Sequence, residues 1–147
     1  VIEDVLKSEL KFWISDLFFK HNVKKEIHLK ESRNLVMTNL PLFLDLIDSV
    51  FAIQITMLKE SEDTSHIFKL VEADEDQDKI ILLFDRTGPD FIKKDGAPDF
   101  EDFKESDFLI LCYDVLHDSA KKLNCNTILE DKAIKLEVPR KASDTEV

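Results

Sequence analysis

The sequence predicts a single α+β domain with a mostly antiparallel sheet packed against two to three helices. Its 147 residues match the usual size of one domain, and the 44% of apolar residues can form a substantial core. Stretches with helical periodicity alternate with strand-like stretches along the chain. No linker divides it, so we expect the domain to span residues 1–139, with a flexible tail at residues 140–147.

The N-terminal half predicts two helices. Apolar residues recur at three- and four-residue spacing over residues 2–20, which is typical of an amphipathic helix. Residues 25–30 alternate in polarity and predict a short strand. Asn39 as cap and Pro41 in the first turn predict a second helix that ends near Ser49.

The following segments predict most of the sheet. Three strands are expected at residues 51–58, 66–72 and 79–84, and the last two are expected to pair as an antiparallel hairpin. Residues 85–99 hold both glycines and predict a long loop. A helix to Leu123 follows, and residues 133–138 predict a closing strand. The expected buried stripe of that helix is Phe108, Cys112, Val115, Leu116, Ala120 and Leu123.

Composition and motifs argue against common enzyme classes. Two glycines leave few places for a phosphate-binding loop. The two cysteines do not make a disulfide framework, the four histidines lack metal-ligand spacing, and no serine has the glycine context of a nucleophile elbow. We therefore expect no enzyme activity, no cofactor and no bound metal. Without a basic stripe, a signal peptide or an apolar run near 18 residues, we also expect no nucleic-acid partner, no membrane span and a cytoplasmic location.

A calcium loop is the nearest approach to a metal site. Asp74, Asp76, Asp78 and Asp85 match loop positions 1, 3, 5 and 12. Lys79 stands where the motif needs glycine, and the flanks are strand-like instead of helical. A solvated hairpin turn is the preferred interpretation, with a docking site for a basic partner as a further alternative.

The charge is unevenly distributed. Residues 60–118 contain 18 acidic and six basic residues, a net of −12 in a chain of net −11. In residues 85–108 carboxylates are interleaved with phenylalanines, a pattern typical of aromatic anchors within a charged rim. The predicted partner-binding residues are Asp74, Glu75, Asp76, Asp78, Asp85, Asp90, Phe91, Asp95, Asp99, Phe100, Glu101 and Asp102.

The leading functional hypothesis is an inhibitor that neutralises a basic protein, as a toxin-immunity protein or antitoxin does. A negative field would attract such a partner and speed its association. Two alternatives remain: a structural, adaptor or secretion-chaperone-like subunit that assembles through apolar helix faces, and a hydrolase centred on Asp85, Arg86 and Asp90.

Overall fold

The computed structural model describes residues 2–30, 39–76, 79–94 and 97–139. Its helices are α1 (Ile2–Trp13), α2 (Leu17–Asn22), α3 (Leu40–Glu60) and α4 (Ser106–Lys122). Its strands are β1 (Val23–His28), β2 (His66–Asp76), β3 (Lys79–Arg86), β4 (Ile92–Lys94), β5 (Ala97–Asp99), β6 (Asn126–Glu130) and β7 (Ala133–Pro139). The predicted tail at residues 140–147 lies outside the described residues.

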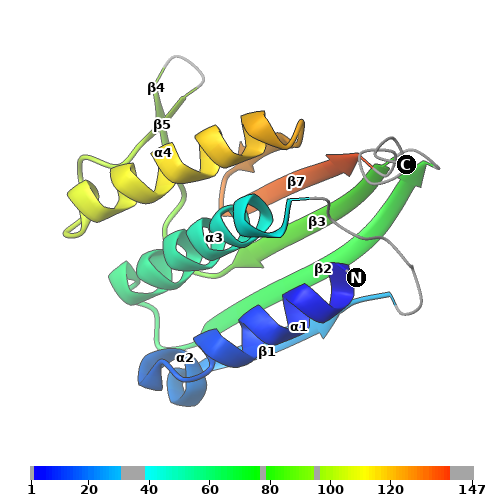
Figure 1. The fold of residues 1–147 in the computed structure, drawn as a ribbon. Helices are drawn as coiled ribbons and strands as arrows, with labels where there is room; N and C mark the ends of the chain where they lie inside the picture. Colours follow the sequence, from blue (N-terminus) through cyan, green and yellow to red (C-terminus); the bar gives the residue numbers. More distant parts are fainter. Residues whose placement is uncertain (1, 31–38, 77–78, 95–96, 140–147) are drawn as a thin grey trace.

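The main sheet has five strands in the order β1-β2-β3-β7-β6. The β1–β2 pair is parallel and the other pairs are antiparallel, including the predicted β2–β3 hairpin. Figure 1 shows α1, α3 and α4 on one face of this sheet, and the small β4–β5 hairpin apart from it. The predicted α+β class with a mostly antiparallel sheet is confirmed.

Alternate side chains of β3 and β7 form the part of the hydrophobic core that the sheet contributes. Every second residue of β3 from Ile80 to Arg86 is buried, and β7 alternates in the same way. The register places Leu82 opposite Leu136 and Phe84 opposite Ile134. Side chains alternate between the two faces of a sheet, so these buried residues of β3 all point toward the helices. Arg86 is the last of them.

Helix α3 overturns the largest single prediction. The helix expected to end near Ser49 continues to Glu60, so the strand predicted at residues 51–58 is wrong. The start is as expected, because Asn39 caps the helix and accepts a hydrogen bond from Leu42 N. Helix α3 packs between the sheet and its neighbouring helices and is buried on most sides. Its sequence therefore lacks the one-sided apolar stripe that identifies a surface helix.

Of the described helices, α3 alone is long and apolar enough by length and composition to cross a membrane. The sequence prediction missed this feature because it divided the segment into a helix and a strand. Twelve of its side chains are buried within the protein. That burial is what the core helix of a soluble domain shows.

Three smaller predictions also needed correction. The helix expected over residues 2–20 is interrupted, because the Asp16 carboxylate accepts from Phe19 N and caps a new helix, α2. Strand β6 was not predicted, and the expected loop at residues 85–99 contains β4 and β5. On α4, Phe108 and Val115 are exposed, whereas Leu109 takes the buried position.

We predict that Phe51→Ala lowers the free energy of unfolding by about 3–5 kcal/mol, the usual cost of deleting a buried phenyl ring. The Phe51 ring is fully buried, with centroids 6.1 Å from Trp13, 5.5 Å from Phe68 and 5.7 Å from Phe84. Urea denaturation measures the change. The control is Leu17→Ala at a residue 72% exposed, where we expect a change within about 0.5 kcal/mol. Equal losses in the two variants would contradict the described core.

Candidate functional site

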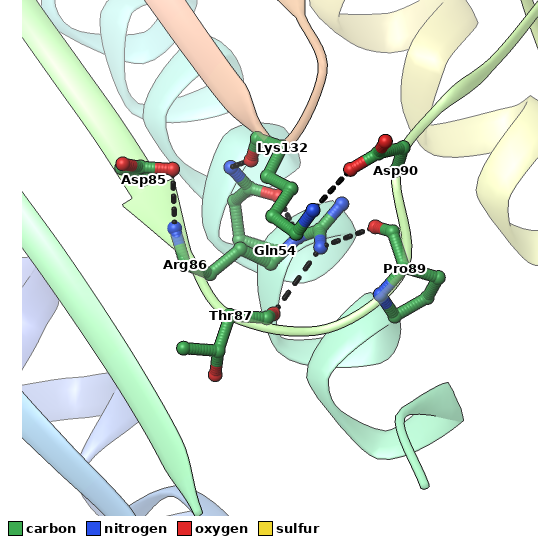
Figure 2. Close-up of polar contacts among 7 residues, drawn as sticks. All are labelled: Gln54, Asp85, Arg86, Thr87, Pro89, Asp90 and Lys132. Carbon is green, nitrogen blue, oxygen red and sulfur yellow. Dashed lines mark hydrogen bonds and ion pairs between the residues drawn. The ribbon is translucent and has the colours of Figure 1, made fainter. Parts of the chain in front are cut away.

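The last residue of β3, Arg86, is a buried cation. It is 4% exposed and lies on the helix-facing side of the strand. Its Nε donates to Gln54 Oε1 at 2.6 Å, and its Nη1 donates to the carbonyls of Pro89 at 2.7 Å and Thr87 at 3.3 Å (Figure 2). These contacts fix the guanidinium beneath the loop that leaves β3.

Gln54 holds Arg86 in place from helix α3. Its side chain is fully buried, and its Nε2 donates to the carbonyls of Phe84 at 2.6 Å and Lys132 at 3.0 Å. Because its Oε1 accepts from Arg86, this amide of α3 satisfies groups from β3 and from the turn between β6 and β7. A buried amide with this many partners sets the position of all three elements.

The loop from Thr87 to Phe91 is held at both ends. Thr87 exchanges two hydrogen bonds with the backbone of Ile67, each of 3.0 Å. Phe91 N donates to the carbonyl of Asp131 at 2.6 Å. Between them Gly88 has φ of +107°, a conformation that favours glycine, and a Cβ at this position would lie only 3.2 Å from Ser61 Cβ. The turn chemistry of the sequence thus fixes the backbone around Arg86.

Charged groups surround the guanidinium. Asp85 accepts a hydrogen bond from Arg86 N at 2.8 Å, and Asp90 forms an ion pair with Lys132. Burial lowers the pKa of Arg86 to about 10, against the opposing effect of the negative charges of Asp85 and Asp90. Arg86 therefore remains cationic at neutral pH.

One nitrogen of the Arg86 guanidinium, Nη2, has no hydrogen-bond acceptor among the described residues. This nitrogen is buried. The face of the guanidinium lies 4.8 Å from the centroid of the Phe91 ring, a cation–π contact that provides no acceptor. A buried cationic donor of this kind is left with an unmet requirement for an acceptor. No cluster of three or more His, Cys, Asp or Glu residues suited to a metal ion occurs in the described part of the chain.

Comparison with known proteins gives one consistent result. No protein-family model and no curated protein matches the sequence. The ThkA histidine kinase catalytic domain, described as a nucleotide-free form, matches with a TM-score of 0.66 and 12% identity, over 95% of this chain and 93% of its own. The fold is that of histidine kinase catalytic domains. The mycobacterial sensor histidine kinase MprB matches with a TM-score of 0.69 and 13% identity, over 94% of this chain and 95% of its own. Acinetobacter baumannii AdeS has a TM-score of 0.66 and 14% identity, over 95% of this chain and 64% of its own.

This likeness corrects the functional hypotheses drawn from charge. The toxin-inhibitor hypothesis with its basic partner, and the expectation that the chain is not an enzyme, are contradicted, because the similar structures are kinase catalytic domains. The adaptor and hydrolase alternatives fail for the same reason. Acidic surfaces occur in proteins of many functions. A structural match over nearly the whole chain, in contrast, identifies one particular fold.

The predicted partner-binding residues do not form one surface of anchors. Phe91 and Phe100 were predicted as partner-binding anchors, and they are 4% and 3% exposed and pack edge to face with centroids 6.0 Å apart. Their position inside a loop hid this, because loop residues have no periodicity from which burial can be inferred.

The acidic members of the predicted set are divided among several places. Asp85 and Asp90 lie near Arg86, whereas Asp99 ends β5, and Glu101 and Asp102 lie on the segment between β5 and α4. Asp74, Glu75 and Asp76 belong to the end of β2. Asp78 and Asp95 lie outside the described residues.

Sequence reasoning missed two residues of the site, Gln54 and Lys132. An amide within the apolar run from Val50 to Leu58 was the available signal for Gln54, since a buried polar group needs partners. Lys132 had no signal, because its role depends on a turn between two strands of which one was not predicted.

A separate pair of carboxyl groups joins α1 to α3. Asp48 accepts a hydrogen bond from Trp13 Nε1 at 3.2 Å and lies against Glu9. Desolvation, together with the hydrogen bond and negative charge of Asp48, raises the pKa of Glu9 to about 7. Below that pH the protonated Glu9 carboxyl donates a hydrogen bond to Asp48 across the helix interface.

We predict that Gln54→Leu lowers the free energy of unfolding by about 3 kcal/mol, because it leaves Arg86 Nε and two carbonyls without their partner. Arg86→Met removes the other partner and is measured alongside, with the double variant, by urea denaturation. The double variant should lose less than the sum of the single losses, since each change removes the same contact. Additive losses would show that the two side chains are not coupled.

We predict that stability decreases as pH rises between about 4.5 and about 7, in part because of Glu9. Its pKa in the folded protein exceeds the model value of 4.5, so its contribution is complete below that pH and is lost as pH rises through 7. Glu9→Gln, which stays neutral, should flatten the pH dependence of the unfolding free energy in that range. Glu130→Gln at an exposed strand end should leave it unchanged. Equal slopes for wild type and Glu9→Gln would contradict the assignment.

Proposed function

We propose that the chain is a nucleotide-binding domain of the histidine kinase type, which uses ATP as a phosphoryl donor. The observation that carries this proposal is the extent of the structural match: 95% of this chain superposes on 93% of the ThkA catalytic domain. The match includes the sheet and the helices together, with no large part of either chain left over.

The candidate site supports a phosphorylated ligand. Arginine binds phosphate oxygens through strong, charge-assisted hydrogen bonds, and Arg86 has one nitrogen without an acceptor. The held backbone of the loop from Thr87 to Phe91 means that this guanidinium is already positioned before a ligand arrives. Preorganisation of this kind reduces the entropy lost on binding.

The overall charge makes local cations necessary. A chain of net −11 repels an anion at long range, so a nucleotide must be bound by nearby positive groups and by burial of its base. Arg86 and Lys132 supply two such groups at one end of the sheet. A cytoplasmic location, where ATP is present, belongs to the same proposal.

We predict that ATP and ADP bind the purified chain and raise its unfolding temperature. A ligand at about 100 times its dissociation constant stabilises a protein by about 2.7 kcal/mol. Titration calorimetry and thermal unfolding, with and without Mg²⁺, measure the effect. Adenosine, which has no phosphate, is the matched control and should bind more weakly than ADP. Absence of binding by both nucleotides at millimolar concentration would contradict the proposed function.

A further inference from the structure

We propose that a groove between helices α1, α3 and α4 binds a small organic ammonium ion, with carboxylates of α3 holding its charge and Trp13 and α4 holding its apolar body. Figure 1 shows α3 between α1 and α4 on the helix-covered face of the sheet. The groove has a volume of about 270 Å³, and its lining includes Trp13, Asp45, Asp48, Leu111, Cys112 and Val115. The inference goes beyond the proposed function, because none of the residues that contact Arg86 lines this groove.

The walls of the groove are apolar. Helix α4 contributes Leu111 and Val115, one helical turn apart and 60% and 38% exposed. Helix α1 contributes Trp13, whose ring stacks on the buried Phe51 and is thereby held in place. Benzene occupies an engineered protein cavity of about 150 Å³, so this groove suits a ligand somewhat larger than one phenyl ring. Apolar walls with a few orienting polar groups are typical of small-molecule sites.

The charged groups of the groove are all acidic. Asp45 and Asp48 line it from α3, and Glu9 of α1 lies against Asp48. Among the residues that the structure describes, no Lys, Arg or His forms an ion pair with these three carboxyl groups. Trp13 Nε1 donates to Asp48 Oδ1 at 3.2 Å and orients that carboxylate beside the apolar wall. An ammonium ion supplies the positive charge and the N–H donors that this arrangement lacks.

The protonation of Glu9 supports a deficit of positive charge here. Desolvation raises the pKa of Glu9 to about 7, and the hydrogen bond to Asp48 and the negative charge of Asp48 act in the same direction. Without a ligand, a proton on Glu9 thus offsets part of the negative charge. An ammonium ion at Asp48 offsets it instead and favours ionised Glu9, so the affinity for the ion rises as pH rises through 7.

The other titratable groups of the groove do not reverse this sign. The charged groups that α3 contributes are Asp45 and Asp48, and both attract a cation. From α4 the titratable group in the lining is Cys112. Burial raises the pKa of the Cys112 thiol, which therefore stays uncharged near neutral pH.

Charge also decides between a small ion and a second copy of the chain. A symmetric dimer would bring the same surface of both copies together. Two chains of net charge −11 would then meet through their acidic grooves and repel each other. The same negative field attracts a small cation, so an ammonium ion with an apolar body is the occupant that the groove favours.

The test follows the fluorescence of Trp13, the single tryptophan of the chain, during titration with phenethylammonium at about pH 8. We expect a saturable change. The uncharged analogue 2-phenylethanol should bind about tenfold more weakly, because it lacks the charged hydrogen bond. Asp48→Asn, which keeps an acceptor for Trp13, should weaken phenethylammonium binding by about tenfold. Asp45→Asn at an exposed carboxylate should weaken it by about threefold.

The matched control is Asp114→Asn. It removes the same charge from an exposed position of α4 outside the groove lining, so the affinity should stay within about twofold at physiological salt. Equal losses for Asp48→Asn and Asp114→Asn would overturn the inference, because they would reduce it to an effect of net charge.

The pH dependence provides a second readout. The affinity of the wild type for phenethylammonium should rise by about three- to tenfold from about pH 6 to about pH 8. The ligand itself stays protonated over this range, because alkyl amines titrate near the lysine value of about 10.4. Glu9→Gln should show no such rise. Identical pH dependences for the wild type and Glu9→Gln would contradict the site.

The remaining outcomes are equally decisive. Equal affinities for phenethylammonium and 2-phenylethanol, or no saturable change with either, would overturn the inference. A dimer in sedimentation that Leu111→Gln dissociates would identify a second copy as the occupant and overturn it too. Asp45→Asn alters an exposed side chain and decides the question even where Asp48→Asn fails to fold. Titration of the same proteins with ATP tests the proposed function separately, since neither result depends on the other.

Discussion

The contact between Gln54 and Arg86 constrains the rest of the domain. A guanidinium buried at the end of β3 needs acceptors, and Gln54 supplies one from the centre of α3 at 2.6 Å. The same amide can satisfy the carbonyls of Phe84 and Lys132 only in one rotation and one translation of α3 over the sheet. Apolar packing alone tolerates small shifts of a helix, so this polar contact adds the specificity that hydrophobic burial lacks.

The core around this contact explains which parts of the fold the sequence could predict. Strands β2, β3 and β7 were predicted from strand-like runs at residues 66–72, 79–84 and 133–138, and the alternation of the last run matches the burial of Ile134, Leu136 and Val138. The second half of α3 is apolar on most sides, and its β-branched residues suit a strand as well as a helix. Local sequence could not settle that choice, because the burial of Phe51 and its neighbours depends on partners distant in the chain.

The functional prediction drawn from the acidic composition was wrong for a related reason. Carboxylates that crowd together in sequence have separate structural tasks in the fold: Glu60 accepts from the backbone of Lys104 and Glu105 before α4, and Asp118 pairs with Lys122 one turn away. Asp85 and Asp90 are the two predicted acidic residues that act on Arg86. Counting the charged residues of a sequence segment cannot show which carboxylates accept hydrogen bonds from backbone N–H groups and which form a binding surface. Both roles use the same side chains.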